Sequence, residues 1–244
     1  MKPSSADPRT PDGGTAPVRT PPIRIEVDKT QTVSGILLTP EKPFTCYVLA
    51  HGAGAGMTHP FMAAVANGLF ARGVATLRYQ FPYMENGSKR PDRPALAHEA
   101  VRAAVVAAGR LAPDLPLLAG GKSFGARMTS QAQAEAPLPG VVGLAFIGFP
   151  LHPAGKPSTE RATHLTNVDI PMFFAQGTRD ALAEPPLLRT VLEQLPNATS
   201  YLIEHADHSF HVPARSGTTD RQVLDKLLDA LTNWAQGICR TRRR

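Results

Sequence analysis

The sequence has no long hydrophobic run and very little cysteine. None of its 244 residues belongs to an apolar stretch of about 18 residues, which argues against a membrane span. The amino terminus also lacks the apolar core of a signal peptide. Only Cys46 and Cys239 are present, far apart, in a predicted strand and a predicted basic tail, so no disulfide is expected. We therefore expect a cytoplasmic protein with no membrane partner.

Basic charge is scarce outside the chain ends. The net charge is +6, but residues 238–244 carry four arginines, and residues 1–22 carry three basic against two acidic side chains. The body of the chain is left close to neutral. A folded surface that binds DNA or RNA concentrates its positive charge on the body, so we expect no nucleic-acid partner.

Composition divides the chain into three segments. Residues 1–22 hold six prolines and few apolar residues, which predicts a disordered tail. Residues 23–236 are rich enough in hydrophobic residues to form one folded domain. Residues 237–244 are predicted to be a basic tail.

Short apolar runs alternate with helix-favouring segments along this domain. Strands are predicted at 23–27, 32–39, 44–50, 74–79, 115–119, 141–147, 171–175 and 199–203. Helices are predicted at 60–72, 94–111, 126–136, 186–195 and 220–234. This alternation predicts an α/β fold with a mostly parallel sheet of about eight strands and helices on both faces. Only about 20 residues separate Gly148 from Pro171, so no large cap domain is expected there.

A G-x-S-x-G motif lies between a predicted strand and a predicted helix. Residues 121–125 read Gly-Lys-Ser-Phe-Gly. In this context the serine occupies a sharp, strained turn that exposes its hydroxyl, so Ser123 is the predicted nucleophile. A phosphate-binding loop is excluded because Pro116 stands where that motif needs glycine.

A serine nucleophile needs a base and an acid that orients the base. Asp180 and His208 follow Ser123 in chain order, each just after a predicted strand, so we predict that they complete a Ser-His-Asp triad. Loops at the carboxyl ends of parallel strands meet at one edge of the sheet. Neighbouring alternatives stay open for the base, His205 and His211, and for the acid, Asp207 and Glu204.

Acyl transfer also needs N–H donors for the oxyanion. We expect one from Phe124 and another from the glycine-rich loop 51–57, with Ala53 the first candidate and Gly54 the second. This loop lacks the third glycine of a dinucleotide-binding motif. The histidines near residue 208 lack a zinc-binding spacing, so we predict no cofactor and no metal.

Polar and aromatic residues of the neighbouring loops are candidates for substrate contacts. We predict that Arg78, Tyr83 and His152 border an open site for a small-molecule acyl substrate. Arg78 is the candidate for pairing with a substrate carboxylate, with an internal acidic partner as the alternative. Structural packing is the alternative for the other two side chains.

Four motifs together resemble the α/β-hydrolase superfamily, in its small dienelactone-hydrolase-like branch. They are His-Gly-Ala-Gly from residue 51, the motif at 121–125, Gln-Gly-Thr-Arg-Asp from residue 176, and Ala-Asp-His-Ser-Phe from residue 206. The resemblance covers roughly residues 30–236. It implies a serine hydrolase that cleaves a small ester or thioester through an acyl-enzyme. Dienelactone hydrolase itself has a cysteine nucleophile where this chain has Ser123.

Two other functions fit the same resemblance. One is an interaction module that keeps the fold but has weak catalysis, as suggested by relatives in chromatin-associated complexes. The other is a small peptidase or amidase. A large gating domain like that of prolyl oligopeptidases does not fit in this chain.

Overall fold

The computed structural model describes residues 23–241. The predicted disordered tail at 1–22 and the last arginines of the basic tail, at 242–244, lie outside the described residues. Within residues 23–241, no helix is both long enough and apolar enough to span a bilayer.

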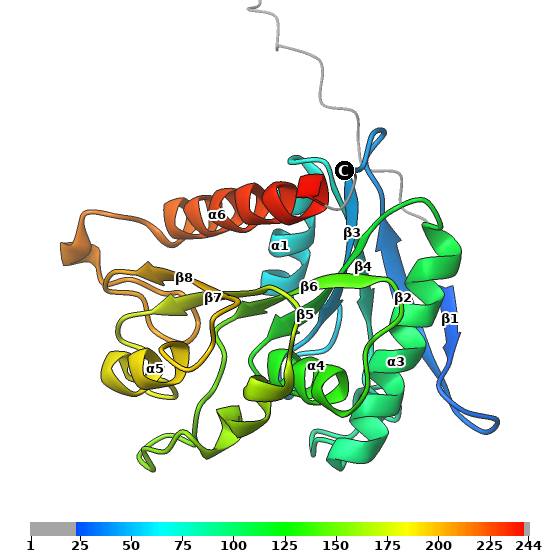
Figure 1. Ribbon diagram of the computed structural model, residues 1–244, viewed down its shortest axis with the longest axis horizontal. Helices are drawn as coiled ribbons and strands as arrows, with labels where there is room; N and C mark the ends of the chain where they lie inside the picture. The colour runs from blue at the N-terminus through cyan, green and yellow to red at the C-terminus, as the bar shows by residue number, and fades with distance from the viewer. Residues whose placement is uncertain (1–22, 242–244) are drawn as a thin grey trace, which may run out of the picture.

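Eight strands form one sheet (Figure 1). They are β1 (Ile23–Glu26), β2 (Thr32–Leu38), β3 (Thr45–Ala50), β4 (Val74–Tyr79), β5 (Leu117–Lys122), β6 (Val141–Ile147), β7 (Met172–Gly177) and β8 (Ala198–Ile203). Their order across the sheet is β1-β2-β4-β3-β5-β6-β7-β8. The pairs β1–β2 and β2–β4 are antiparallel, and all others are parallel. The predicted α/β fold is confirmed.

Helices cover both faces of this sheet. They are α1 (Pro60–Phe70), α2 (Pro82–Glu85), α3 (Pro94–Leu111), α4 (Phe124–Glu135), α5 (Pro185–Leu192) and α6 (Asp220–Thr241), with 3₁₀ helices η1 (Glu160–Asn167) and η2 (Ala214–Ser216). The helices α1 and α6 pack on one face, and α3, α4 and α5 pack on the other; in Figure 1, α6 lies above the sheet and α5 below it. Each face buries its own hydrophobic cluster.

Local sequence explains where these helices begin and how closely they pack. The helices α1, α3 and α5 each start with proline, whose fixed φ suits the first helical position. In α3, the buried face is largely alanine, as at Ala97, Ala100, Ala104 and Ala108. These small side chains let the helix approach the sheet closely.

Several predicted boundaries shift by a few residues, and two of the shifts have a clear structural cause. The strand predicted at 115–119 runs instead from Leu117 to Lys122, because Gly120 and Gly121 fit between neighbouring strands where a Cβ would not. The basic tail predicted from residue 237 is wrong for residues 237–241, which belong to α6. That helix continues because Cys239 is buried one turn after Ala235, on the same apolar stripe.

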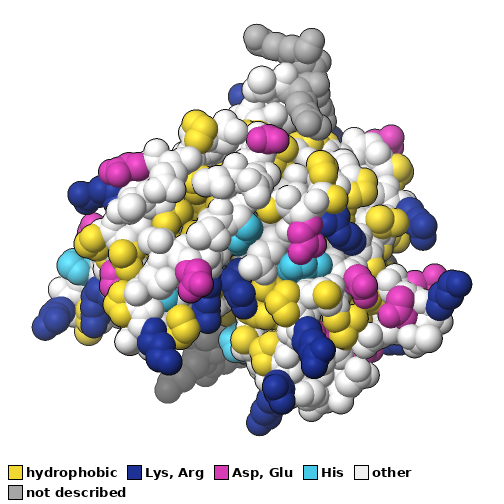
Figure 2. All heavy atoms as spheres, turned by 60° about the horizontal axis from the view of Figure 1, so that its bottom comes forward, with side chains coloured by type: hydrophobic (Ala, Val, Ile, Leu, Met, Phe, Trp, Pro, Cys, Tyr) yellow, Lys and Arg dark blue, Asp and Glu magenta, His cyan; other side chains and the backbone are white. Residues whose placement is uncertain are grey.

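The sheet edge that carries the predicted site is not covered by a cap domain. Between β6 and β7 the chain forms only the short helix η1 and loops. Neither Cys46 nor Cys239 is in a disulfide, and both are buried. Figure 2 shows the side that faces down in Figure 1, where acidic and basic side chains are interspersed rather than gathered in a single stripe.

Candidate active site

Ser123 occupies a strained turn between β5 and α4. Its φ is 52° and its ψ is −110°, a conformation that residues other than glycine rarely adopt. The turn packs tightly against the end of β3. A Cβ on Gly125 would lie only 2.6 Å from the carbonyl oxygen of Ala50. Glycine at this position therefore lets α4 start against the end of β3 and leaves the Ser123 side chain at the sheet edge.

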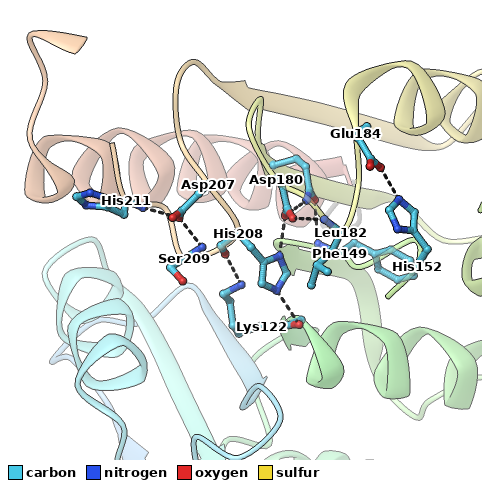
Figure 3. A network of polar contacts seen from close by, with 12 residues as sticks. Lys122, Phe149, His152, Asp180, Leu182, Glu184, Asp207, His208, Ser209 and His211 are labelled. Atoms are coloured by element: carbon cyan, nitrogen blue, oxygen red, sulfur yellow. Dashed lines mark hydrogen bonds and ion pairs between the residues drawn. The ribbon is translucent and has the colours of Figure 1, made fainter. Parts of the chain in front are cut away.

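The hydroxyl of Ser123 lies in a chain of hydrogen bonds with His208 and Asp180 (Figure 3). His208 Nε2 is 2.8 Å from Ser123 Oγ, and His208 Nδ1 is 2.7 Å from Asp180 Oδ2. The His208 ring is 24% exposed, whereas the Asp180 side chain is fully buried. The three residues come from loops after β5, β7 and β8, as their positions in the sequence predicted.

Asp180 is held by two further donors. The backbone N–H of Leu182 donates to Oδ1 at 2.8 Å, and Gln176 Nε2 donates to Oδ2. Gln176 is oriented in turn by its Oε1, which accepts the N–H of Phe149 at 2.9 Å. Sequence reasoning gave Gln176 no role, although it opens the motif that ends at Asp180. A polar side chain in an otherwise apolar buried strand was the available signal.

The neighbouring residues that the sequence left open as base or acid do not join the hydrogen bonds at Ser123. His211 Nδ1 pairs with Asp220, which begins α6, and Asp207 accepts the backbone N–H groups of Ser209 and His211. Glu204 accepts from the hydroxyl of Thr178 at 3.3 Å. His205 is exposed, and within residues 23–241 it is the ring of His208, not that of His205, that hydrogen-bonds to Ser123. Geometry thus favours His208 and Asp180 over these neighbours.

The glycine-rich loop 51–57 is anchored by its first residue. His51 Nδ1 donates to the carbonyl of Gly52 at 2.8 Å, and Nε2 accepts the N–H of Phe81 at 3.1 Å. Burial lowers the pKa of His51 to about 4, against the opposing hydrogen bond to Gly52. The imidazole is therefore neutral near pH 7, with its proton on Nδ1. Its two hydrogen bonds hold the backbone where the chain leaves β3.

The two amides predicted to bind an oxyanion differ within this loop. The Gly54 N–H donates to the hydroxyl of Tyr83 at 3.0 Å, so it is already engaged. Among residues 23–241, the N–H groups of Ala53 and Phe124 make no hydrogen bond. Both residues line a cavity together with Ser123. Ala53 and Phe124 therefore fit the oxyanion role better than Gly54.

The three side chains predicted to contact substrate are instead buried supports. Arg78 donates to the carbonyl of Met57 at 3.0 Å and is only 8% exposed, because it lies within the central strand β4. Tyr83 is buried and supports Gly54. His152 is fully buried and pairs with Glu184 (Figure 3). The three were predicted to border the site, but none of them lines either cavity at Ser123.

Lys122 is a further member of the site, at the variable position before Ser123. Its ammonium donates to the carbonyl oxygen of His208 at 2.6 Å and lies 5.4 Å from the centre of the Phe210 ring. Burial lowers the pKa of Lys122 to about 8, although the charges of Asp180 and Asp207 act in the opposite direction. The G-x-S-x-G pattern gives this position no role, so sequence reasoning missed it.

Two cavities flank Ser123. One, of about 330 Å³, also contacts His208, Lys122 and the apolar side chains of Phe61 and Met62. The other, of about 300 Å³, lies on the α4 side. Leu182 and Ala53 contribute to both. Within residues 23–241, no group of three or more His, Cys, Asp or Glu side chains is arranged to hold a metal ion.

The chain matches known proteins at the level of family and fold. Residues 43–236 match the family model of the alpha/beta hydrolase domain. This chain belongs to the α/β-hydrolase family. As a member, it is a hydrolase of the α/β-hydrolase type, in the dienelactone-hydrolase-like branch that the four motifs indicated.

Solved structures share this fold over most of the chain. A dienelactone hydrolase from Anabaena variabilis ATCC 29413 is 20% identical, with a TM-score of 0.73 over 91% of this chain and 98% of that one. XC6422 from Xanthomonas campestris, described as a serine hydrolase without a lid, is 19% identical, with a TM-score of 0.68 over 91% and 95%. Est1E from Butyrivibrio proteoclasticus is 14% identical, with a TM-score of 0.68 over 89% and 98%.

Proposed function

We propose that this hydrolase cleaves small esters or thioesters through an acyl-enzyme, with Ser123 as nucleophile, His208 as general base and acid, and Asp180 as the group that orients His208. The observation that carries the proposal is the unbroken pair of hydrogen bonds from Ser123 Oγ to His208 and from His208 to Asp180. A serine hydroxyl is a weak nucleophile without such a base.

In the first half-reaction, His208 Nε2 takes the proton of Ser123 Oγ while Oγ bonds to the carbonyl carbon of the substrate. The carbonyl oxygen becomes negatively charged, and the N–H groups of Ala53 and Phe124 are the donors available to stabilise it. Asp180, buried and hydrogen-bonded to Nδ1, stabilises the imidazolium that forms.

Collapse of the tetrahedral intermediate then breaks the bond to the leaving oxygen or sulfur. His208 Nε2 donates its proton to that atom, and the alcohol or thiol departs, leaving the acyl group on Ser123. In the second half-reaction His208 takes a proton from water, whose oxygen attacks the acyl carbon. Return of the proton to Ser123 Oγ releases the carboxylic acid and regenerates the enzyme.

The cavities support small substrates. Volumes of about 330 and 300 Å³ on either side of Ser123 accommodate short groups on both sides of a scissile bond. No cap domain encloses the site between β6 and β7. These dimensions favour short acyl and alcohol groups over long lipid chains.

The test is the Ser123→Ala variant, assayed with 4-nitrophenyl butyrate. We expect kcat to fall by at least about 10³-fold, with an unchanged circular dichroism spectrum, because the nucleophile is lost while the fold is kept. Ser200→Ala, at an exposed serine on β8, is the matched control and should keep full activity. Wild-type turnover by Ser123→Ala would refute the assignment.

Covalent labelling separates this proposal from a catalytically inactive interaction module. A fluorophosphonate probe should modify Ser123 in the native protein and fail to modify Ser123→Ala. A folded protein that does not react with the probe would favour the interaction module. Comparing 4-nitrophenyl butyrate with the matching 4-nitroanilide tests for an amidase, and we expect the ester to be much the better substrate.

A further inference from the structure

The cavity on the α4 side of Ser123 contains two arginines. Arg127, on the first turn of α4, and Arg161, on η1, line it together with Ser123 and Phe124. The two arginines come from segments far apart in sequence, and both side chains are half-buried. Neither was singled out by the sequence motifs.

Neither guanidinium forms an ion pair within the described part of the chain. Among residues 23–241, no Asp or Glu oxygen lies within 4.0 Å of either one, and neither makes a side-chain hydrogen bond. Arg72 differs, since it donates to Asp229 at 2.7 Å. Asp92 also lines this cavity, but it accepts the backbone N–H of Tyr83 at 3.0 Å rather than pairing with an arginine.

The two positive charges also act on each other. Burial lowers the pKa of Arg127, and the neighbouring charge of Arg161 lowers it further. The Arg127 guanidinium lies 5.9 Å from the centre of the Phe124 ring, beside the turn that carries Ser123. Two like charges partly removed from water disfavour the empty cavity, and an anion bound between them would relieve that repulsion.

The cavities differ in which part of an ester they suit. The leaving atom must lie near His208 to receive its proton, and His208 lines only the other cavity. The cationic group of that other cavity, Lys122, is already bonded to the His208 carbonyl. The arginine cavity therefore suits the acyl part, with the side chains of Phe124, Pro150 and Leu182 available to pack against methylene groups.

We propose that the preferred substrates are esters or thioesters whose acyl chain ends in an oxyanion, a carboxylate or a phosphate-like group, bound by Arg127 and Arg161. This inference rests on the proposed function and specifies its substrate class. Arginine suits this role because its planar guanidinium can bind carboxylate and phosphate oxygens through two parallel hydrogen bonds.

The first experiment compares 4-nitrophenyl esters of matched chain length on the full-length protein. They are the neutral hexanoate, the monoester of adipate with its terminal carboxylate, and the 5-phosphonopentanoate. We expect kcat/KM for at least one anionic ester to exceed that for hexanoate by about tenfold or more, and the preference to shrink as salt is raised. The anionic ester with the larger preference identifies the oxyanion.

A second pair of substrates locates the charge. Both compounds are acetate esters of a phenol. In 4-acetoxybenzoate the phenol carries a carboxylate, and in its methyl ester the phenol is neutral. We expect at most a small difference between these two. A preference for the charged alcohol equal to that for a charged acyl chain would overturn the assignment of the arginine cavity to the acyl part.

Variants then assign the preference to the two arginines. Arg161→Gln and Arg127→Gln should each reduce the anionic-to-neutral ratio of kcat/KM by about tenfold, and Arg161→Lys should restore part of it. Arg189→Gln, at an exposed arginine on α5, is the control and should leave the ratio unchanged. A ratio unaffected in both glutamine variants would overturn the proposal.

The outcomes separate the two proposals. Hydrolysis of hexanoate and both anionic esters at equal rates would overturn the anionic specificity while leaving the serine hydrolase in place. Hydrolysis of none of these esters, together with no fluorophosphonate labelling, would overturn the serine hydrolase and the specificity with it.

Discussion

Lys122 holds the backbone of His208: its ammonium donates a 2.6 Å hydrogen bond to the His208 carbonyl oxygen. The residue before Ser123 thus fixes the loop whose imidazole reaches Ser123. The contact crosses from β5 to the segment after β8, as Figure 3 shows. It is a positioning contact, because Lys122 acts on the reaction through His208.

Lys122→Met should lower kcat/KM by about tenfold at pH 7, because the His208 loop loses a charge-assisted hydrogen bond. The pKa of Lys122 is about 8, so the ammonium is charged below that pH and loses its proton above it. The advantage of wild type over the variant should therefore be largest below pH 8 and shrink above it. The measurement is a pH profile of kcat/KM for both proteins.

Lys226→Met is the control for this experiment, since Lys226 is exposed on α6. Its pH profile should overlay that of wild type. A constant ratio between wild type and Lys122→Met from pH 6 to pH 10 would contradict a role for the charge of Lys122.

Acid should destabilise the fold through His51. Its pKa in the folded state is about 4, against 6.5 as the ordinary value, so the unfolded chain binds the proton first as pH falls. The free energy of unfolding is unaffected by this group above pH 6.5. It decreases by on the order of 3 kcal/mol as the pH falls from 6.5 towards 4. Urea unfolding at several pH values measures the slope.

His51→Asn should be less stable than wild type at pH 7 but lose less stability on acidification. His164 contributes a slope of the same sign, because burial also lowers its pKa to about 4, so the slope is reduced rather than abolished. His205→Asn, at an exposed side chain, should keep the wild-type slope. Equal slopes in wild type and His51→Asn would show that His51 is not a buried neutral residue.

Tyr83→Phe should impair catalysis by loosening loop 51–57. The Gly54 N–H would lose its acceptor, at a cost of about 1 kcal/mol, and the adjacent Ala53 amide would be less well fixed. We expect a decrease of about tenfold in kcat with little change in KM, as for an interaction made in the transition state. Tyr201→Phe, on β8, is the control. A change confined to KM would point to a substrate contact instead.

Gly125→Ala should disrupt the turn at Ser123. The added Cβ would lie 2.6 Å from the Ala50 carbonyl oxygen, so either β3 or α4 must move. We expect a loss of about 2–4 kcal/mol of stability, measured by urea unfolding, and no measurable esterase activity. Gly237→Ala in α6 meets no atom within 4 Å and should stabilise the helix by about 0.5–1 kcal/mol. Full activity in Gly125→Ala would contradict the close approach.

The sequence predicted the sheet and the meeting of Ser123, His208 and Asp180 because these depend on strand order and chain position. It did not predict the roles of Arg78 and His152, because the direction of a side chain within a buried strand or loop depends on tertiary packing. Arg78 lies near the end of β4. Sequence alone does not reveal that its guanidinium donates a hydrogen bond to the carbonyl oxygen of Met57. The presence of Arg127 and Arg161 in one cavity likewise depends on where η1 packs against α4.

Ala50 lies against both glycines of the Ser123 turn. A Cβ at Gly121 or at Gly125 would meet its carbonyl oxygen, and loop 51–57 begins at the very next residue. The positions of the Ser123 hydroxyl and of the Ala53 amide therefore both depend on the position of the Ala50 peptide group. A thermal fluctuation that displaces the end of β3 moves the Ser123 hydroxyl and the Ala53 amide together. The distance between these two groups therefore changes less than the position of either one.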